Sequence, residues 1–254
     1  NGVLLMLFVV MQVSATERVR VIHVVVALCD NVHQGIVPVP ASLGNGDDPS
    51  ANLYWGALYG VKTVFNNSSA WRRMNSEGPV VGTPILERCV YRHMDYPDIY
   101  LVVEAYRGRD IRQAVRDFFQ LLAGAPVVYE LGGRTVDQSG RELVVYVGHN
   151  GLMDFKLSAL PEKPDGRRRD AMVLACKSQS YFSGPIVTLG GQPVLMTTGF
   201  MAPEAYVLAA ALDGWTVGED QNKIRLRAAT AYHQYQKCGL NGARRLFGAA
   251  AGGQ

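Results

Sequence analysis

Residues 19–28 read VRVIHVVVAL, a nearly unbroken run of β-branched and other apolar side chains. A strand with one face in water alternates apolar and polar residues, whereas a strand covered on both faces is apolar almost throughout. Strands of the second kind belong mostly to parallel sheets with helices packed on both sides. We therefore expect this segment to be a buried strand of an α/β protein.

The clearest helix is predicted to begin at Asp110. Its apolar positions recur every three or four residues and form one stripe. They are Ile111, Ala114, Val115, Phe118, Phe119 and Leu122. Asp110 and Gln113 resemble a capping box, and Gly124 supplies a stop. These signals predict an amphipathic helix that packs its apolar stripe on the sheet.

The remaining chain continues to alternate between strand and helix patterns. Further strands are expected over residues 85–91, 100–105, 143–147, 171–175 and 193–198, and further helices over residues 52–65, 203–212 and 222–237. This alternation predicts an α/β fold, a three-layer sandwich of a mostly parallel sheet with helices on both faces. No internal repeat and no long linker interrupts it. We expect one domain over residues 16–247 and a flexible tail over residues 248–254.

The composition excludes several classes of protein. The chain has 254 residues, of which 48% are hydrophobic and 19% charged, so it is too apolar to be disordered. Its formal net charge of +3 is too small to predict nucleic-acid binding. Four cysteines are too few for a disulfide scaffold but enough for a nucleophile and some structural thiols.

Residues 3–13 form an apolar run that is too short to span a bilayer core of roughly 30 Å as a helix. The run has the length of the apolar part of a signal peptide, and Val13-Ser14-Ala15 fits a cleavage site with small residues. We expect residues 1–15 to be a signal peptide truncated at its start and the mature chain to be secreted or periplasmic. A buried first strand or helix is the alternative. We expect no membrane span in the mature chain.

Reactive side chains stand where three of the apolar runs stop. They are Cys29-Asp30-Asn31, Gly148-His149-Asn150-Gly151 and Cys176-Lys177-Ser178. In open α/β sheets, binding sites lie outside the carboxyl ends of the strands. A histidine and a cysteine at the ends of successive parallel strands would lie about 5–10 Å apart at the same edge. Such a pair can exchange protons with each other or with a leaving group bound between them.

These segments resemble the caspase-like cysteine peptidases, the family of caspases, metacaspases, legumains and gingipains. The signature of that family is an apolar strand that ends in His-Gly, followed by an apolar strand that ends in Ala-Cys. Residues 144–151 read VVYVGHNG and residues 172–176 read MVLAC, and Cys176 comes 27 positions after His149. Residues 52–57, NLYWGA, are similar to the start of the family's first helix. The resemblance covers most of residues 20–215 and implies a caspase-like fold.

The resemblance also implies amide hydrolysis through a thioester on Cys176, with His149 as the general acid and base. The backbone N–H of Cys176, with one near Asn150 or Gly151, would stabilise the oxyanion. The family places Gly directly after His, whereas this chain has Asn150 there and Gly151 next.

Four further residues are candidates for the substrate pocket. Asp30 would form a wall that favours a basic side chain before the scissile bond. Cys29 would line the site as a second thiol on the same edge. His33 and Ser178 lie close to these strand ends in the sequence.

Other interpretations of the same residues remain open. A lone cysteine at a strand end is usually a small buried hydrophobe, and four cysteines in an exported protein could form two disulfides. The chain could be an inactive caspase-like binding domain, or an unrelated α/β hydrolase or acyl transferase that uses the same pair. We expect a peptide or protein substrate, no nucleic acid, no cofactor and no metal. Residues 44–48, GNGDD, are expected to be a plain turn rather than a calcium loop. The sequence predicts no oligomeric state.

Overall fold

A computed structural model describes residues 18–163 and 165–248. The expected signal peptide, residues 1–15, lies outside the described residues, and so does most of the expected tail, residues 249–254. No helix in the described part of the chain is both long enough and apolar enough to cross a membrane.

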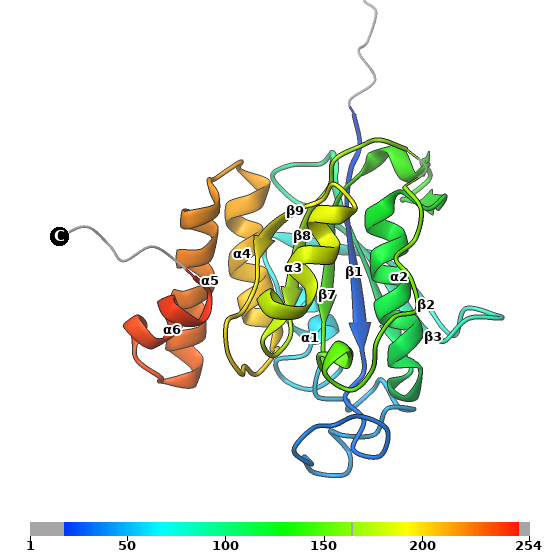
Figure 1. Cartoon of the computed structure of the whole chain (residues 1–254). Helices are drawn as coiled ribbons and strands as arrows, with labels where there is room; N and C mark the ends of the chain where they lie inside the picture. Colours follow the sequence, from blue (N-terminus) through cyan, green and yellow to red (C-terminus); the bar gives the residue numbers. More distant parts are fainter. Residues whose placement is uncertain (1–17, 164, 249–254) are drawn as a thin grey trace, which may run out of the picture.

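The centre of the molecule is a seven-stranded sheet with the strand order β2-β3-β4-β1-β7-β8-β9 (Figure 1). Its strands are β1 (Arg20–Ala27), β2 (Trp71–Glu77), β3 (Ile85–His93), β4 (Ile99–Tyr106), β7 (Arg141–Val147), β8 (Asp170–Leu174) and β9 (Gln192–Leu195). The pairs from β4 through β1, β7 and β8 to β9 are parallel, and β3 runs antiparallel between β2 and β4. A separate two-stranded sheet joins β5 (Tyr129–Glu130) to β6 (Thr135–Val136). The prediction of a mostly parallel α/β sheet is confirmed.

The run that suggested a buried strand forms β1, with β4 on one side and β7 on the other. Residues 21–27 of this strand are all buried. His23, the one polar side chain among residues 21–27, is satisfied internally, with Nε2 3.0 Å from Oε2 of Glu104. Because both edges and both faces of β1 are covered, its sequence is apolar almost without interruption.

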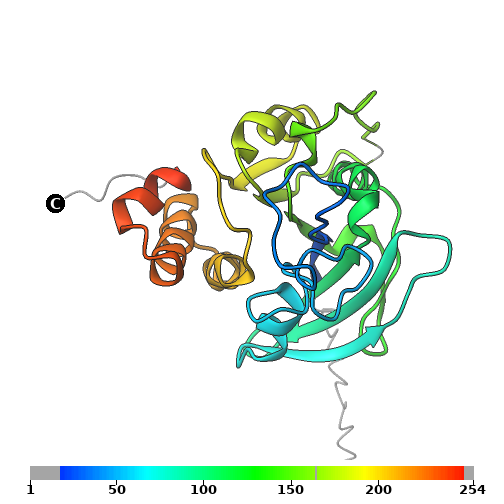
Figure 2. The ribbon, with the colours of Figure 1, turned by 90° about the horizontal axis from the view of Figure 1, so that it is seen from below.

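Helices cover both faces of this sheet and make the three layers of the sandwich (Figure 2). The helices are α1 (Val61–Asn66), α2 (Ile111–Ala123), α3 (Ser178–Thr188), α4 (Ala205–Thr216), α5 (Gln221–Gln236) and α6 (Leu240–Leu246). One core cluster packs α1, α4, α5 and α6 against the side of β1 that carries Ile22 and Val24. A second core packs α2 and α3 against the side that carries Val25 and Ala27.

The helix predicted from Asp110 is confirmed as α2, and Gly124 follows it with φ of 103° in the left-handed region that glycine adopts easily. The predicted capping box is wrong, because the side chain of Asp110 caps no backbone N–H. A short 3₁₀ turn, Gly108–Asp110, precedes α2 instead. Gln113 turns along the helix and donates to Asp117 at 2.6 Å.

The helix expected over residues 52–65 is wrong in its first half, since α1 covers only Val61–Asn66. The side chain of Asn52 explains the difference, because it accepts from the backbone N–H of Cys29 at 3.0 Å and donates to the carbonyl of Cys29 at 2.8 Å. These bonds fasten the segment to the end of β1 as a series of turns. Tyr54 and Trp55 are buried from that irregular backbone, whereas Leu58 is exposed.

Candidate active site

A pocket of about 350 Å³ opens at the carboxyl ends of the parallel strands and contains both His149 and Cys176. Its lining comes from the segments that follow β1, β7, β8 and β9, together with Tyr54. The lining residues are Gly35, Ile36, Val37, Tyr54, Gly148, His149, Met153, Cys176, Phe200, Met201 and Pro203. Because β7 and β8 are adjacent and parallel, the two segments that follow them meet at one edge of the sheet. The structure thus brings the expected histidine and cysteine into one cavity.

The turn after β7 depends on Gly148. Its φ of 144° is a conformation that residues with a side chain rarely adopt, and a Cβ there would lie 2.7 Å from the carbonyl oxygen of Ala27. The close approach to the end of β1 sets the position of the next residue, His149. The hydroxyl of Tyr146 donates to the carbonyl of His149 at 2.8 Å and holds the same turn from below.

The ring of His149 is oriented by a carboxylate that the sequence did not suggest. Nε2 of His149 lies 2.7 Å from Oδ2 of Asp154, and the His149 side chain is only 6% exposed. A carboxylate accepts hydrogen bonds, so in the neutral ring the proton lies on Nε2 and the lone pair on Nδ1. The backbone N–H of Gly35 also donates to Asp154 at 3.1 Å, which connects this carboxylate to the loop after β1. The ring therefore presents a basic nitrogen on the side away from Asp154.

Cys176 is partly exposed and lies in the tight connection between β8 and α3. Its thiol donates to the carbonyl oxygen of Met201 at 3.5 Å, and its sulfur accepts from the backbone N–H of Met201 at 3.4 Å. The following residue, Lys177, has a φ of 50°, a left-handed conformation that turns the chain abruptly into α3. In this resting arrangement the thiol is held by the segment after β9 rather than by the imidazole.

Asn150, the residue that departs from the family pattern, is fully buried between the two turns. It donates from Nδ2 to the carbonyl of Cys176 at 2.7 Å, and its Oδ1 accepts from the N–H of Leu152 at 3.1 Å. Neither Asn150 nor Gly151 lines the pocket. Gly151 begins the 3₁₀ turn Gly151–Met153, and the side chain of Asn150 caps that turn. Of the residues expected at the oxyanion, only Cys176 lines the pocket.

The four expected substrate-pocket residues do not line this pocket. Asp30 is 5% exposed, and its carboxylate accepts from the N–H of Val32 at 2.9 Å and of His33 at 3.1 Å. The ring of His33 lies 2.9 Å from the same carboxylate, on the solvent side. The hydroxyl of Ser178 is buried, and it donates to the carbonyl of Val173 at 2.8 Å. These groups stabilise the turns around the site instead of facing its interior.

The thiols differ sharply in their surroundings. Burial raises the pKa of Cys29 to about 11, and burial also raises the pKa of Cys89, so both are protonated at neutral pH. Cys238 is exposed but lies after α5, away from the pocket lining. All four cysteines fall in the described residues and are free, which contradicts the alternative of two disulfides.

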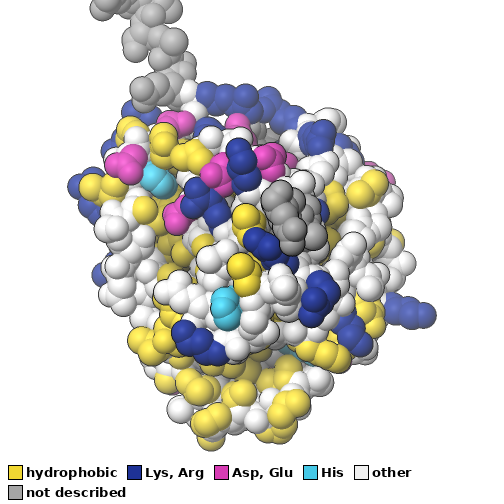
Figure 3. All heavy atoms as spheres, turned by 90° about the vertical axis from the view of Figure 1, so that its left-hand side faces the viewer, with side chains coloured by type: hydrophobic (Ala, Val, Ile, Leu, Met, Phe, Trp, Pro, Cys, Tyr) yellow, Lys and Arg dark blue, Asp and Glu magenta, His cyan; other side chains and the backbone are white. Residues whose placement is uncertain are grey.

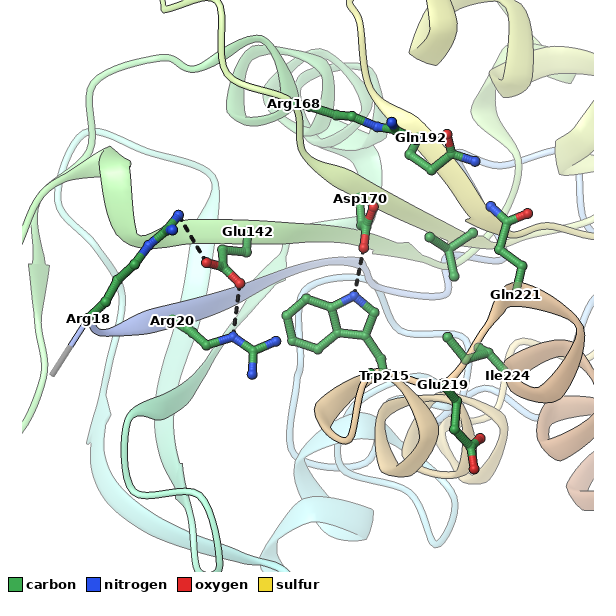
Figure 4. Close-up of a pocket in the computed structure, with 12 residues that line it drawn as sticks. Arg18, Arg20, Glu142, Arg168, Asp170, Gln192, Trp215, Glu219, Gln221 and Ile224 are labelled. Carbon is green, nitrogen blue, oxygen red and sulfur yellow. Dashed lines mark hydrogen bonds and ion pairs between the residues drawn. The ribbon is translucent and has the colours of Figure 1, made fainter.

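Another cavity of about 560 Å³ lies around Trp215, at the amino ends of the parallel strands (Figure 4). The charged groups that line it already have partners. Glu142 pairs with Arg18 at 3.1 Å and with Arg20 at 2.9 Å, and Asp170 accepts from the indole of Trp215 at 2.8 Å (Figure 4). No cysteine or histidine lines this cavity. Of these two cavities, only the one at the carboxyl ends of the strands is lined by a cysteine and a histidine.

No cluster of three or more His, Cys, Asp or Glu side chains suited to a metal ion occurs within residues 18–163 and 165–248. In the turn over residues 44–48, Asp47 pairs with Arg107 at 2.9 Å and with Arg109 at 2.7 Å. The basic run at residues 167–169 is only partly solvated, because Arg169 is 1% exposed and pairs with Asp165 at 2.9 Å.

The other residues of the site had only weak signals in the sequence. Asp154 lies five positions after His149, which is a spacing that fits a short turn, but no pattern marked it. Phe200 and Met201 come from the segment between β9 and α4, far from Cys176 in the chain. Comparison of the chain with protein-family models, with curated proteins and with solved structures found no match.

Proposed function

We propose that this protein is a cysteine peptidase in which Cys176 is the nucleophile and His149 the general acid and base. The observation that carries the proposal is that both side chains line one pocket at the ends of adjacent parallel strands. The second support is Asp154, which holds the imidazole so that a basic nitrogen is left free. The third is the resemblance of residues 144–151 and 172–176 to the caspase-like peptidases.

The chemistry begins when a substrate carbonyl displaces the resting contacts of the thiol with Met201. The thiol gives its proton to Nδ1 of His149, and the sulfur attacks the carbonyl carbon. The backbone N–H of Cys176 donates to the oxyanion that forms. Hydrogen bonds of this kind often tighten only when a substrate is bound, which is consistent with a resting thiol directed at Met201.

The tetrahedral intermediate collapses when the C–N bond breaks and the leaving amine takes the proton from the imidazolium of His149. A thioester to Cys176 remains. Water then gives a proton to His149 while its oxygen attacks the thioester. The C–S bond breaks, the carboxylic product leaves, and the sulfur regains its proton from the imidazole. Asp154 stabilises the imidazolium in both halves of the cycle.

The test is cleavage of a mixture of fluorogenic peptides by the protein with Cys238→Ser, which removes the exposed thiol outside the pocket. We expect Cys176→Ala to abolish cleavage in this background and His149→Ala to reduce kcat/KM by about 10²–10⁴-fold. The matched control is Cys89→Ala, which removes a buried thiol of β3 that does not line the pocket. Cleavage that survives Cys176→Ala would refute the proposal.

Two other outcomes identify the alternatives. If a small alkylating reagent modifies Cys176 but no peptide is cleaved, the fold serves in binding rather than in catalysis. If Cys176 takes acyl groups only from activated thioesters and never from peptides, the protein is an acyl transferase. The proposal that the protein is exported rests on the sequence of residues 1–15 alone.

A further inference from the structure

We propose that the pocket at Cys176 selects an apolar side chain on the substrate residue whose carbonyl is attacked. This inference rests on the proposed peptidase function and names its substrate class. It replaces the sequence-based expectation of a basic side chain, which depended on Asp30.

The chemical character of the lining is the first ground for the inference. Apart from the reacting pair and Tyr54, the lining side chains are all apolar, and the backbone of two glycines completes the wall. No Asp, Glu, Lys or Arg is among the lining residues. A pocket with these walls stabilises a bound side chain by removing apolar surface from water.

Two charged side chains next to the pocket make contacts with its lining residues. The ammonium of Lys177 lies 4.5 Å from the centre of the Phe200 ring, in a cation–π contact on that ring. The carboxylate of Asp154 is bonded to His149 and to the N–H of Gly35. Neither Lys177 nor Asp154 is among the residues that line the pocket.

The carboxylate of Asp30 is not part of the pocket lining. Within its own turn it binds the N–H groups of Val32 and His33 and the ring of His33. Gly46 and Gly108 pack so closely on it that a Cβ at either position would lie within 3 Å of Asp30 atoms. Because the turn after β1 needs these contacts, Asp30 cannot serve as the anionic floor of a pocket for lysine or arginine.

The rim of the pocket is apolar and uncovered. Val37, from the loop after β1, is 88% exposed, and Phe200, from the segment after β9, is 67% exposed. Met153, in the 3₁₀ turn after β7, is also exposed. In Figure 3, hydrophobic side chains gather at the lower end of the molecule, the end where Figure 1 shows the loop after β1. A substrate with a large apolar side chain would cover this rim.

Selection follows from the cost of burying charge. A lysine, arginine or aspartate side chain that entered the pocket would lose water without gaining a partner, whereas leucine, methionine or phenylalanine would gain from the transfer. We therefore expect a preference of about tenfold or more in kcat/KM for the apolar side chains, the scale on which a hydrophobic pocket discriminates.

The experiment compares peptide probes that all carry the same reactive carbonyl group. They differ only in the residue to which that carbonyl belongs, which is leucine, phenylalanine, lysine, aspartate or asparagine. The rate at which each probe modifies Cys176 is measured by mass spectrometry in the protein with Cys238→Ser. The inference predicts the fastest modification by leucine or phenylalanine. Equal rates, or a preference for a charged residue, would overturn the inference and leave the peptidase function standing. If no probe reacts while iodoacetamide still does, the peptidase function itself fails.

A pair of variants tests whether the rim determines the preference. Val37→Asp places a carboxylate on the pocket lining, and Val32→Asp places one on the same loop outside the lining, where the side chain is 81% exposed. Because both positions are exposed, both variants should fold. We expect Val37→Asp to shift the leucine-to-lysine ratio toward lysine by about two- to fivefold, the strength of an exposed ion pair. An unchanged ratio in Val37→Asp, or an equal shift in Val32→Asp, would contradict the assignment of the rim.

Discussion

Nδ2 of Asn150 lies 2.7 Å from the backbone carbonyl oxygen of Cys176. The side chain of Asn150 is fully buried, and its Oδ1 accepts from the N–H of Leu152. One side chain thus ties the turn that carries the histidine to the turn that carries the cysteine. A glycine at this position could not make either bond, so the departure from the family pattern gives the site an additional fastening.

Asn150→Asp tests this role. The substitution keeps the size of the side chain and the acceptor for Leu152 but replaces the donor to Cys176 with a repelling oxygen. We expect kcat/KM for peptides to fall about 5- to 100-fold, as for the loss of one buried hydrogen bond. Asn75→Asp, on the exposed strand β2, is the control and should change nothing. Full activity in Asn150→Asp would show that the two turns do not need this bond.

Asp154→Asn tests the orientation of the imidazole. The amide can still accept a hydrogen bond, but it no longer stabilises a positive charge on His149. We expect kcat/KM to fall by up to about 100-fold. This is less than the full contribution of general acid–base catalysis, because His149 itself remains. The change should appear mainly in kcat, because Asp154 does not line the pocket. Asp47→Asn is the control, and equal activity in the two variants would contradict the role of Asp154.

Gly148→Ala tests the backbone turn beneath the histidine. The new Cβ would lie 2.7 Å from the carbonyl oxygen of Ala27, and the φ of 144° would be strained. We expect the free energy of unfolding to fall by about 1–3 kcal/mol. Urea denaturation measures the change, and Gly78→Ala is the control because nothing lies within 4 Å of its Cβ position. A neutral effect of Gly148→Ala would mean that the turn tolerates a side chain.

The lowered pKa of Glu104 makes the stability of the fold depend on pH. Burial alone would raise the pKa of Glu104, but the charges and hydrogen bonds of His23 and Arg88 outweigh burial and lower the pKa to about 2. The carboxylate therefore stabilises the folded state fully above about pH 4.5, and this stabilisation is lost as the pH falls toward 2. At pH 7 it is on the order of 3 kcal/mol.

The corresponding variant is Glu104→Gln, followed by urea denaturation from pH 7 to pH 2.5. We expect the variant to be less stable than the wild type at pH 7 and the difference to shrink as the pH falls. Glu77→Gln removes an exposed carboxylate 3.9 Å from the same Arg88 and should have little effect. A difference that stayed constant across this pH range would contradict the lowered pKa.

The strands at the centre of the sheet could be predicted because burial on both faces leaves an unbroken apolar run, as in β1, β7 and β8. The strand β2 could not, since only Trp71 of its seven residues is buried and an exposed edge strand leaves no apolar pattern. The helix α3 was missed for a similar reason. Its buried residues are only Ser178, Phe182 and Ile186, and Pro185 lies inside it.

The sharing of one pocket by His149 and Cys176 could be predicted, because two strands that follow each other in the chain are adjacent and parallel. Their carboxyl ends therefore lie side by side. The other members of the site depend on contacts between distant segments. Met201 meets Cys176 only because the segment after β9 folds back over the end of β8. Asp30 comes shortly after β1, as a pocket residue would. Its carboxylate, however, accepts hydrogen bonds within its own turn and does not face the pocket.

The most direct measurement is the rate at which a small alkylating reagent modifies Cys176 as a function of pH, with and without His149. It is made in the Cys238→Ser background, in which Cys29 and Cys89 remain buried. If the imidazole and the thiol share one pocket and exchange a proton, His149→Ala must lower the rate at neutral pH and change the shape of the profile. Superimposable profiles for the two proteins would show that His149 does not act on the sulfur, and the peptidase mechanism would fall.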